Sequence, residues 1–146
     1  MSDLYLFDTN ILVHLIRDDR TGQEIKAKYI PYTKVIKPLI CSVSDGELRS
    51  LALQFLWGGQ KLDQMEFALS YFGRVPIEST EMMKTYGVLD AFSKSKGIKM
   101  GKNDLWIAAA SYVSGAILLT TDADFRHLYP DFIGLEKIEL IRNSNI

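Results

Sequence analysis

Five acidic residues stand after short apolar segments or near the starts of predicted helices, where together they can bind a metal ion. Asp8 follows the first apolar run, Glu47 and Asp104 stand near the starts of predicted helices, and Asp122 and Asp124 follow a late apolar run. Carboxylates that converge without a Lys or Arg cluster raise one another's pKa unless a cation lies between them. Ligand sets made only of oxygen favour Mg²⁺ or Mn²⁺, and such a site polarises a phosphate oxygen and activates water for in-line attack.

Each acid also has a purely structural explanation. Acidic side chains at N-caps and in first turns bind free N–H groups and complement the helix dipole. This accounts for Asp104 or Asp122 taken alone, and Glu47 alone fits a solvated side chain. It accounts less well for Asp8, because Thr9 and Asn10 add two more side-chain oxygens after the same strand. The metal hypothesis therefore requires that the acids meet in one place.

Short apolar runs alternate with longer amphipathic segments, which is typical of β-α-β units. Strands are predicted at 4–7, 39–43, 74–77, 116–120 and 137–141. Helices are predicted at 11–16, 63–72, 79–95, 103–113 and 122–128, with a broken helical segment at 21–34 that Pro31 interrupts. A further helix, capped by Ser44 or Asp45, has an apolar face of Leu48, Leu51, Ala52 and Phe55 and ends at Gly58 and Gly59.

This order predicts an α/β protein, a three-layer α/β/α sandwich with a mostly parallel, about five-stranded central sheet. We expect one domain over residues 1–146. In an open parallel sheet, ligands bind beyond the carboxyl ends of the strands, and the crossover helices begin at that same edge. The acids are therefore expected to meet at one sheet edge, although they are far apart in sequence.

The composition narrows the class of protein. The chain is 47% hydrophobic and 24% charged, with a net charge of −1, so the totals do not imply a strongly basic nucleic-acid-binding surface. Four basic residues near the predicted edge, Arg17, Arg49, Lys102 and Arg126, are either phosphate contacts or solvated charges. The single Cys41 can form no internal disulfide or zinc cluster. We expect a cytoplasmic protein, because no signal segment or membrane span is evident.

Four segments of the chain, in the same order, resemble the signature segments of PIN domains, and most of all the VapC-type ribonuclease toxins of bacterial toxin–antitoxin pairs. The segments are LFDTNIL at 6–12, SVSDGELR at 42–49, NDLWIAAA at 103–110 and LTTDADF at 119–125. The resemblance implies an Mg²⁺- or Mn²⁺-dependent endoribonuclease that hydrolyses RNA phosphodiester bonds and leaves a 5′-phosphate. It also implies a cognate antitoxin as partner and favours a homodimer.

By this resemblance, Asp8, Glu47, Asp104 and Asp122 are the catalytic and metal-binding acids, with Asp8 and Asp104 as the firmest ligands. Asp124 is the alternative fourth acid. Thr9, Asn10 and Thr121 are expected to orient carboxylates and water. In this family the regions at 29–37 and 57–65 help to contact the antitoxin, and the residues here match no pattern that identifies the partner.

Other interpretations stay open at this point. Asp122 and Asp124 form an Asp-x-Asp pair like that of haloacid-dehalogenase-like phosphohydrolases, but those enzymes carry the pair on their first strand. A non-catalytic PIN-like module that binds RNA or protein is the other alternative. Four apolar residues, Phe67, Leu69, Tyr71 and Phe72, extend beyond one helix face, and if exposed they indicate an interface with a second copy or with the antitoxin.

Overall fold

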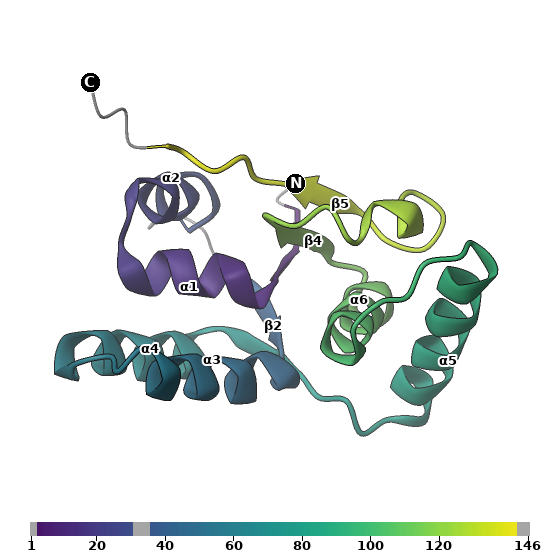
Figure 1. Ribbon diagram of the computed structural model, residues 1–146, viewed down its shortest axis with the longest axis horizontal. Coiled ribbons are helices and arrows are strands. Elements are labelled where there is room, and N and C mark those ends of the chain that lie inside the picture. The colour runs from purple at the N-terminus through teal and green to yellow at the C-terminus, as the bar shows by residue number, and fades with distance from the viewer. Residues whose placement is uncertain (1–2, 31–35, 143–146) are drawn as a thin grey trace.

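The computed structural model describes residues 3–30 and 36–142, which form a parallel β-sheet with helices on both faces (Figure 1). The strands are β1 (Tyr5–Phe7), β2 (Leu39–Cys41), β3 (Gly73–Val75), β4 (Ile117–Thr120) and β5 (Leu135–Lys137). They lie in the order β3-β2-β1-β4-β5, and every neighbouring pair is parallel. The predicted three-layer α/β/α sandwich with a five-stranded sheet is confirmed.

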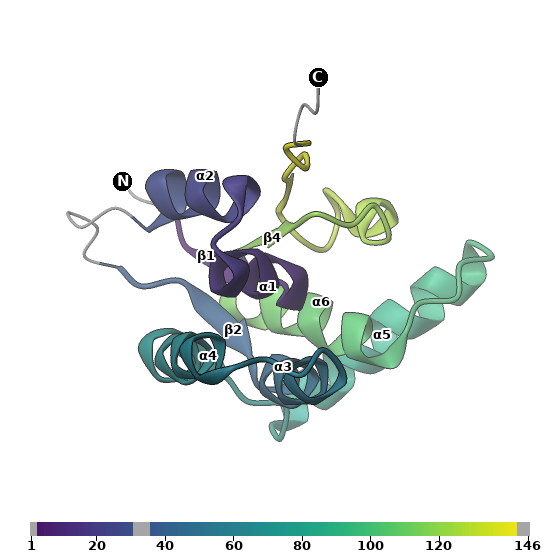
Figure 2. The same cartoon turned by 60° about the vertical axis from the view of Figure 1, so that its left-hand side comes forward.

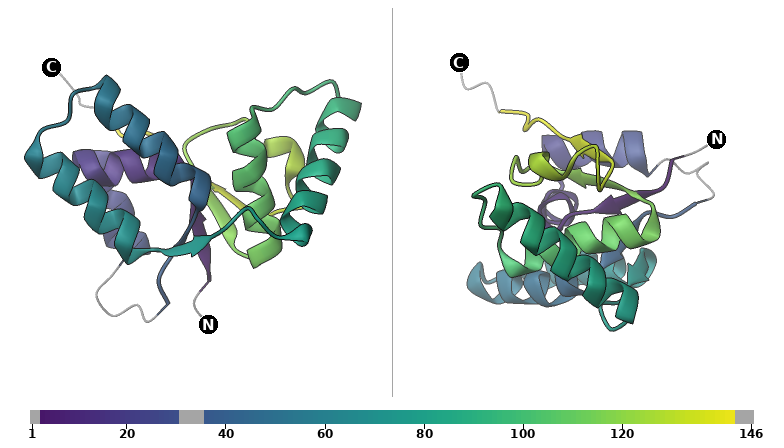
Figure 3. Two further views of the ribbon diagram at one scale, coloured as in Figure 1. Left: turned by 90° about the horizontal axis from the view of Figure 1, so that it is seen from below. Right: turned by 90° about the vertical axis from the view of Figure 1, so that its right-hand side faces the viewer.

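Helices cover the two faces of this sheet in two groups, best seen in Figures 2 and 3. On one face lie α5 (Thr80–Ser95) and α6 (Lys102–Ser114). On the other lie α1 (Thr9–Arg17), α2 (Arg20–Tyr29) and α4 (Gly59–Tyr71), with α3 (Ser42–Gln54) beside α4. Among the described residues, no helix is long and apolar enough to cross a membrane.

The strand sequences explain why both faces are covered. Successive residues of a strand point to opposite faces of the sheet, and here both sets are apolar. Leu6 and Leu118 pack into the core beneath α5 and α6, whereas Phe7 and Leu119 pack into the core beneath α1, α2 and α4. All four side chains are fully buried. The free Cys41 is buried and belongs to the core beneath α5 and α6.

The predicted strand at 137–141 is wrong in position, because β5 lies earlier in the chain. Phe125, Leu128 and Ile133 enter the core directly after β4, and they bring the chain back to the sheet by Leu135. Gly134 passes so close to Ile117 that a Cβ atom would lie 3.2 Å from its side chain. Tertiary packing, which the apolar pattern of residues 137–141 does not contain, therefore sets the start of this edge strand.

Two predicted helix starts are also wrong. Neither Ser44 nor Asp45 caps α3, which begins at Ser42 with Cys41 as its N-cap residue. The side chains of Ser44 and Asp45 hydrogen-bond elsewhere, to Thr9 and to two arginines. The predicted helix at 122–128 is only the short 3₁₀ helix η1 (Arg126–Leu128), because the Asp122 side chain forms a turn instead.

Other details of the helices differ from prediction in smaller ways. Phe55, expected on the apolar face of its helix, is 57% exposed, whereas Leu48 and Ala52 of that face are buried. The helix ends at Gln54, and Gly58 is instead the N-cap residue of α4. The break expected near Pro31 agrees with the end of α2 at Tyr29, although Pro31 itself lies outside the described residues.

The strand order creates the place where a ligand can bind. From β1 the chain proceeds to β2 and β3 on one side, whereas β4 and β5 lie on the other side of β1. The connections therefore reverse direction between β1 and β4, and in α/β sheets ligands bind in the crevice beyond the carboxyl ends of such strands. Asp8 follows β1 directly, and Asp122 follows β4 after one residue.

Candidate functional site

Asp8 is held rigidly at the centre of the site. It is the N-cap residue of α1 and is only 4% exposed. Its Oδ1 accepts a hydrogen bond of 2.7 Å from the Thr9 backbone N–H, and its Oδ2 accepts one of 2.7 Å from the Thr120 hydroxyl. Both carboxylate oxygens therefore have fixed positions at the switch point between β1 and β4.

Glu47 of α3 is linked to α1 through hydrogen bonding with Thr9. The Thr9 hydroxyl donates to Glu47 Oε1 at 2.6 Å and lies 2.8 Å from the Ser44 hydroxyl. Because the Thr9 hydroxyl has one hydrogen, Ser44 must be the donor in the second contact. Glu47, expected near the start of its helix, lies in the second turn of α3, since α3 begins at Ser42.

Three further carboxylates meet beside this pair. Asp104 lies in the first turn of α6, and Asp122 and Asp124 lie in the turn after β4. The three side chains present oxygen atoms that all lie within 4.8 Å of one another. Asp122 is half-buried and accepts a 3.0 Å hydrogen bond on Oδ1 from the Asp124 N–H, whereas the Asp124 side chain is exposed. The structure thus brings both candidates for the fourth acid next to Asp104.

The electrostatics reflect this crowding. Burial raises the pKa of Asp8 to about 7, with smaller contributions from the charges of Asp104 and Glu47, and the Thr120 hydrogen bond opposes the rise. Burial likewise raises the pKa of Asp104 to about 6, and Asp122, Glu47 and Asp124 add to the rise. The charges of Asp104 and Glu47 act on Asp8, and those of Glu47, Asp122 and Asp124 act on Asp104, so the five acids share one local field.

No basic side chain neutralises this field within the part of the chain that the structure describes. The ion pairs found there join other acids, such as Asp45 with Arg49 and Arg74. A divalent cation fits the site for this reason, because it would offset the repulsion that raises the two pKa values. The donors are all carboxylate oxygens, which suit Mg²⁺ or Mn²⁺ better than zinc.

The surrounding polar residues correspond only in part to the predicted ones. Thr9 orients Glu47, and Asn10 Oδ1 accepts from the Thr121 N–H at 3.3 Å, so Thr121 contributes its backbone. Sequence reasoning missed Ser44 and Thr120. The Thr120 hydroxyl also accepts a 3.0 Å hydrogen bond from the Asp122 N–H. The signal for Thr120 is the register, since the pairing of Phe7 with Leu119 sets Asp8 beside Thr120.

The chain belongs to the PIN domain family, whose family model matches residues 5–129. This match contains all the acids described above and confirms the resemblance found in the four segments. A search of curated proteins finds no match to the chain.

Solved structures with the same fold include chains from VapBC complexes. A chain of the Rickettsia felis VapBC2 complex, bound to a DNA fragment from its promoter, is 25% identical with a TM-score of 0.73, and the match covers 92% of this chain and 98% of that one. A chain of DNA-bound VapBC from Salmonella typhimurium has a TM-score of 0.75 at 20% identity, and the match covers 93% of this chain and 98% of that one. A chain of VapBC-5 from Mycobacterium tuberculosis has a TM-score of 0.68 at 20% identity, and the match covers 95% of this chain and 100% of that one. For the two structures at 20% identity, the likeness shows the fold alone.

Proposed function

We propose that this protein is a divalent-metal-dependent endoribonuclease and the toxin of a toxin–antitoxin pair. The observation that carries the proposal is the meeting of five carboxylates at the switch point of a PIN-family sheet without a basic partner among the described residues. RNA is the substrate we propose, on the resemblance to VapC-type toxins.

Asp8 and Asp104 are the proposed principal metal ligands, completed by Asp122 or Asp124 and by Glu47. When bound there, Mg²⁺ or Mn²⁺ would stabilise negative charge on the phosphate oxygens and would make water a better nucleophile at neutral pH. Thr120 and the Thr9 N–H orient Asp8 for this role. Because carboxylates bind metal when ionised, the raised pKa values of Asp8 and Asp104 make metal binding and loss of their protons linked events.

Glu47 is the proposed proton acceptor for the attacking water. Its Oε1 accepts from Thr9, and this bond aims the carboxylate while its second oxygen can accept from water. In the hydrolysis we propose, water attacks phosphorus, the bond from phosphorus to the 3′ oxygen breaks, and that oxygen takes up a proton. The products are a 5′-phosphate and a 3′-hydroxyl.

The test is cleavage of total bacterial RNA by the purified, antitoxin-free protein, with Mg²⁺ or Mn²⁺ and with EDTA, followed by mapping of fragment 5′ ends. We expect discrete cuts that need the metal and carry a 5′-phosphate. Asp8→Asn keeps the size of the side chain but removes its charge, so this variant is expected to fold and to lose cleavage. A fully active Asp8→Asn variant would disprove the assignment of the site.

Two further assays, of phosphomonoester hydrolysis and of RNA binding, separate the alternatives. Hydrolysis of a small phosphomonoester without RNA cleavage would favour the phosphohydrolase alternative, which membership in the PIN family already disfavours. RNA binding that is equal with and without metal, with no cleavage, would favour a non-catalytic module.

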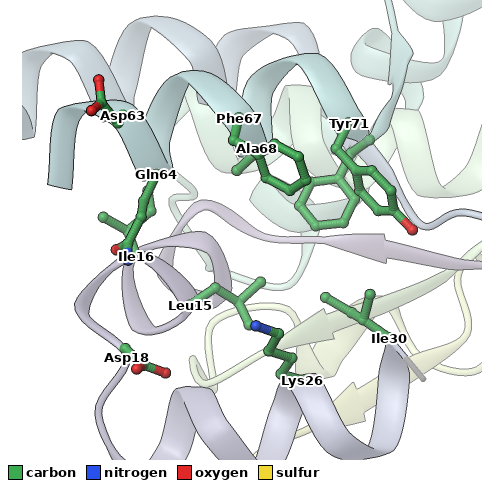
Figure 4. Close-up of a pocket in the computed structure, with 11 residues that line it drawn as sticks. Leu15, Ile16, Asp18, Lys26, Ile30, Asp63, Gln64, Phe67, Ala68 and Tyr71 are labelled. Atoms are coloured by element: carbon green, nitrogen blue, oxygen red, sulfur yellow. The ribbon is translucent and has the colours of Figure 1, made fainter. Parts of the chain in front are cut away.

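We also propose where the antitoxin binds, in a groove whose lining contains none of the five acids of the site. A groove of about 610 Å³ lies between α1, α2 and α4 (Figure 4). Phe67 and Tyr71 line it from α4, Leu15 from α1, and Ile30 from the C-cap of α2. Phe67 is 67% exposed, whereas Leu69 and Phe72 of the same predicted interface are buried. An apolar groove of this kind fits an apolar segment of a partner chain, and likeness to chains from VapBC complexes supports an antitoxin as that partner.

The groove proposal is tested by co-expression and co-purification with the cognate antitoxin. Phe67→Glu places a charge in the groove and is expected to reduce complex formation. Met83→Glu, on exposed α5, is the matched control, because Met83 is 50% exposed outside the groove. Equal loss of the complex in both variants would reject the groove as the binding site.

The homodimer and the cytoplasmic location stay predictions. Light scattering of the purified toxin tests whether it is a homodimer.

A further inference from the structure

A cavity of about 490 Å³ adjoins the acidic site on the side of α6 and η1. One wall comes from the segment before α6, with Lys99 and Met100, and the other from the segment after β4, with Ala123, Asp124 and Arg126. Asp124 belongs both to this cavity and to the group of carboxylates. Its volume lies within the roughly 300–1,000 Å³ of ordinary ligand pockets. Whatever enters the cavity therefore lies next to the proposed reaction site.

The cavity has two free positive charges. Lys99 and Arg126 are exposed, and neither forms an ion pair with an acidic side chain of the described residues. Two other basic residues that were candidates for phosphate contact, Arg49 and Arg17, are already engaged, whereas Lys102 is exposed and does not line the cavity. Arg49 bonds to Asp45 and Glu66, and the Arg17 guanidinium lies 5.7 Å from the centre of the Phe55 ring.

The inner wall of the cavity is apolar and fixed in place. Met100 is 8% exposed, and Ile98 and Ala123 add further apolar surface. The His127 ring completes this wall, and its Nε2 lies 2.8 Å from the Ser93 hydroxyl of α5. Apolar surface and a ring beside cations suit a nucleotide, whose base and ribose can lie on the wall while its phosphate meets the charges.

We propose that this cavity receives the nucleotide next to the scissile phosphate of a single-stranded RNA, with Lys99 and Arg126 contacting its phosphate. The inference rests on the proposed function, since it places the substrate beside the same carboxylates. It adds two substrate-binding residues, of which Arg126 was one of several basic candidates in the sequence and Lys99 was not considered.

The first test measures binding of a fluorescent single-stranded RNA by anisotropy in EDTA, where no cleavage takes place. We expect Lys99→Ala/Arg126→Ala to raise Kd about tenfold or more, because two phosphate contacts are lost, and to reduce the salt slope by about 0.7 per contact. The matched control is Lys61→Ala/Lys84→Ala, which removes two exposed lysines from α4 and α5 and changes the net charge equally. Equal Kd values for the two double variants would overturn the proposal.

The second test locates the ligand by NMR titration of the wild type with adenosine 5′-monophosphate or uridine 5′-monophosphate. We expect shifted amide signals at 98–101 and 123–127, and these shifts are expected to be lost in Lys99→Ala/Arg126→Ala. Shifts confined to other segments, or none at all, would reject the cavity as a nucleotide site. Loss of antitoxin binding without change in RNA affinity would assign the two cations to a protein interface and would also overturn the proposal.

Cleavage kinetics separate this inference from the proposed function. If the wild type cuts RNA, the Lys99/Arg126 double variant is expected to raise KM while kcat changes little, because these contacts hold substrate equally before and during reaction. If the wild type is active and the variant has an unchanged KM, the inference about the cavity is rejected but the proposed function is not. An inactive wild type that still binds nucleotide at 98–101 and 123–127 would sink the proposed function and leave the binding site.

Discussion

At the scale of single residues, the site depends on how Asp8 is held. Its two oxygens accept from Thr9 and Thr120, yet burial keeps its pKa near 7. The hydrogen bonds favour the ionised form, whereas burial and the neighbouring acids oppose it more strongly. Asp8 in the metal-free protein is therefore a carboxyl group that ionises near neutral pH and is fixed in position for a ligand.

Thr120→Val tests the part of this arrangement that the sequence did not reveal. Valine has nearly the same shape, but it leaves Asp8 Oδ2 and the Asp122 N–H without their shared partner. We expect a loss of about 1–3 kcal/mol in the free energy of unfolding and roughly 10–100-fold weaker Mn²⁺ binding by calorimetry. Thr121→Val is the control, because its backbone N–H still donates to Asn10. Equal effects of both substitutions would contradict the role given to Thr120.

The raised pKa of Asp8 also predicts how stability depends on pH without metal. An acid with a pKa of about 7 in the folded protein and 3.8 when unfolded binds more protons in the folded state between those values. Stability therefore falls as pH rises through this window, and the loss is complete above pH 7. The Asp8→Asn variant has no carboxyl group at this position and therefore lacks this loss. In EDTA, its free energy of unfolding is expected to exceed that of the wild type by roughly 2–4 kcal/mol at pH 8 and to differ little from it at pH 4. Urea unfolding at both pH values measures the difference, and a constant difference would refute it.

At the scale of elements, α1 must lie at a fixed position because Asp8 is its N-cap residue and it carries Asn10. Its contact with α2 is very close at Gly22, where a Cβ atom would lie 2.1 Å from the His14 carbonyl oxygen of α1. Only glycine permits this approach of the two helices. The packing of α2 thus fixes α1, and α1 in turn fixes the centre of the site.

Gly22→Ala is expected to destabilise the protein by roughly 2–3 kcal/mol, because backbone must move to accept the methyl group. The corresponding fall in Tm is roughly 5–10 °C for a chain of this size. Gly87→Ala is the control, since Gly87 lies in α5 with open space around its Cβ position. That substitution is expected to stabilise by about 0.5–1 kcal/mol, as alanine favours a helix interior. Thermal unfolding checks both, and an unchanged Tm for Gly22→Ala would contradict the close packing.

At the scale of the whole molecule, metal binding, protonation and folding are coupled. The acids come from four separate regions of the chain and meet only when the sheet has formed. A ligand that binds only the folded state stabilises it by mass action. Binding of a cation also requires the ionised acids, and the pKa values of Asp8 and Asp104 are about 7 and about 6.

We therefore expect Mn²⁺ to raise the Tm of the wild type, and to raise it more at pH 8 than at pH 5.5. At the lower pH both acids are largely protonated in the metal-free protein, so protons compete with the cation. Asp104→Asn is expected to lose most of the increase at both pH values. Scanning fluorimetry with and without Mn²⁺ measures the shifts, and an increase of equal size at pH 5.5 and pH 8 would contradict this linkage.

The sequence by itself determined the class of fold and the candidate acids. Apolar runs that alternate with amphipathic segments require strands covered on both faces, and the residues that follow those strands must lie at one edge. Asp8, Glu47, Asp104 and Asp122 were therefore predictable as neighbours, because topology alone brings them together. Their catalytic roles stay predictions until the variants are measured.

Only the tertiary structure decided the features that depend on register and on packing between distant segments. The pairing of β1 with β4 sets Thr120 and not Thr121 against Asp8. Phe125 and Leu128 enter the core, so β5 begins earlier in the chain than the sequence pattern predicts. The same segment forms one wall of the cavity beside Asp124. Local sequence patterns report which face of an element is apolar, whereas register and close contacts arise from the sum of many long-range interactions.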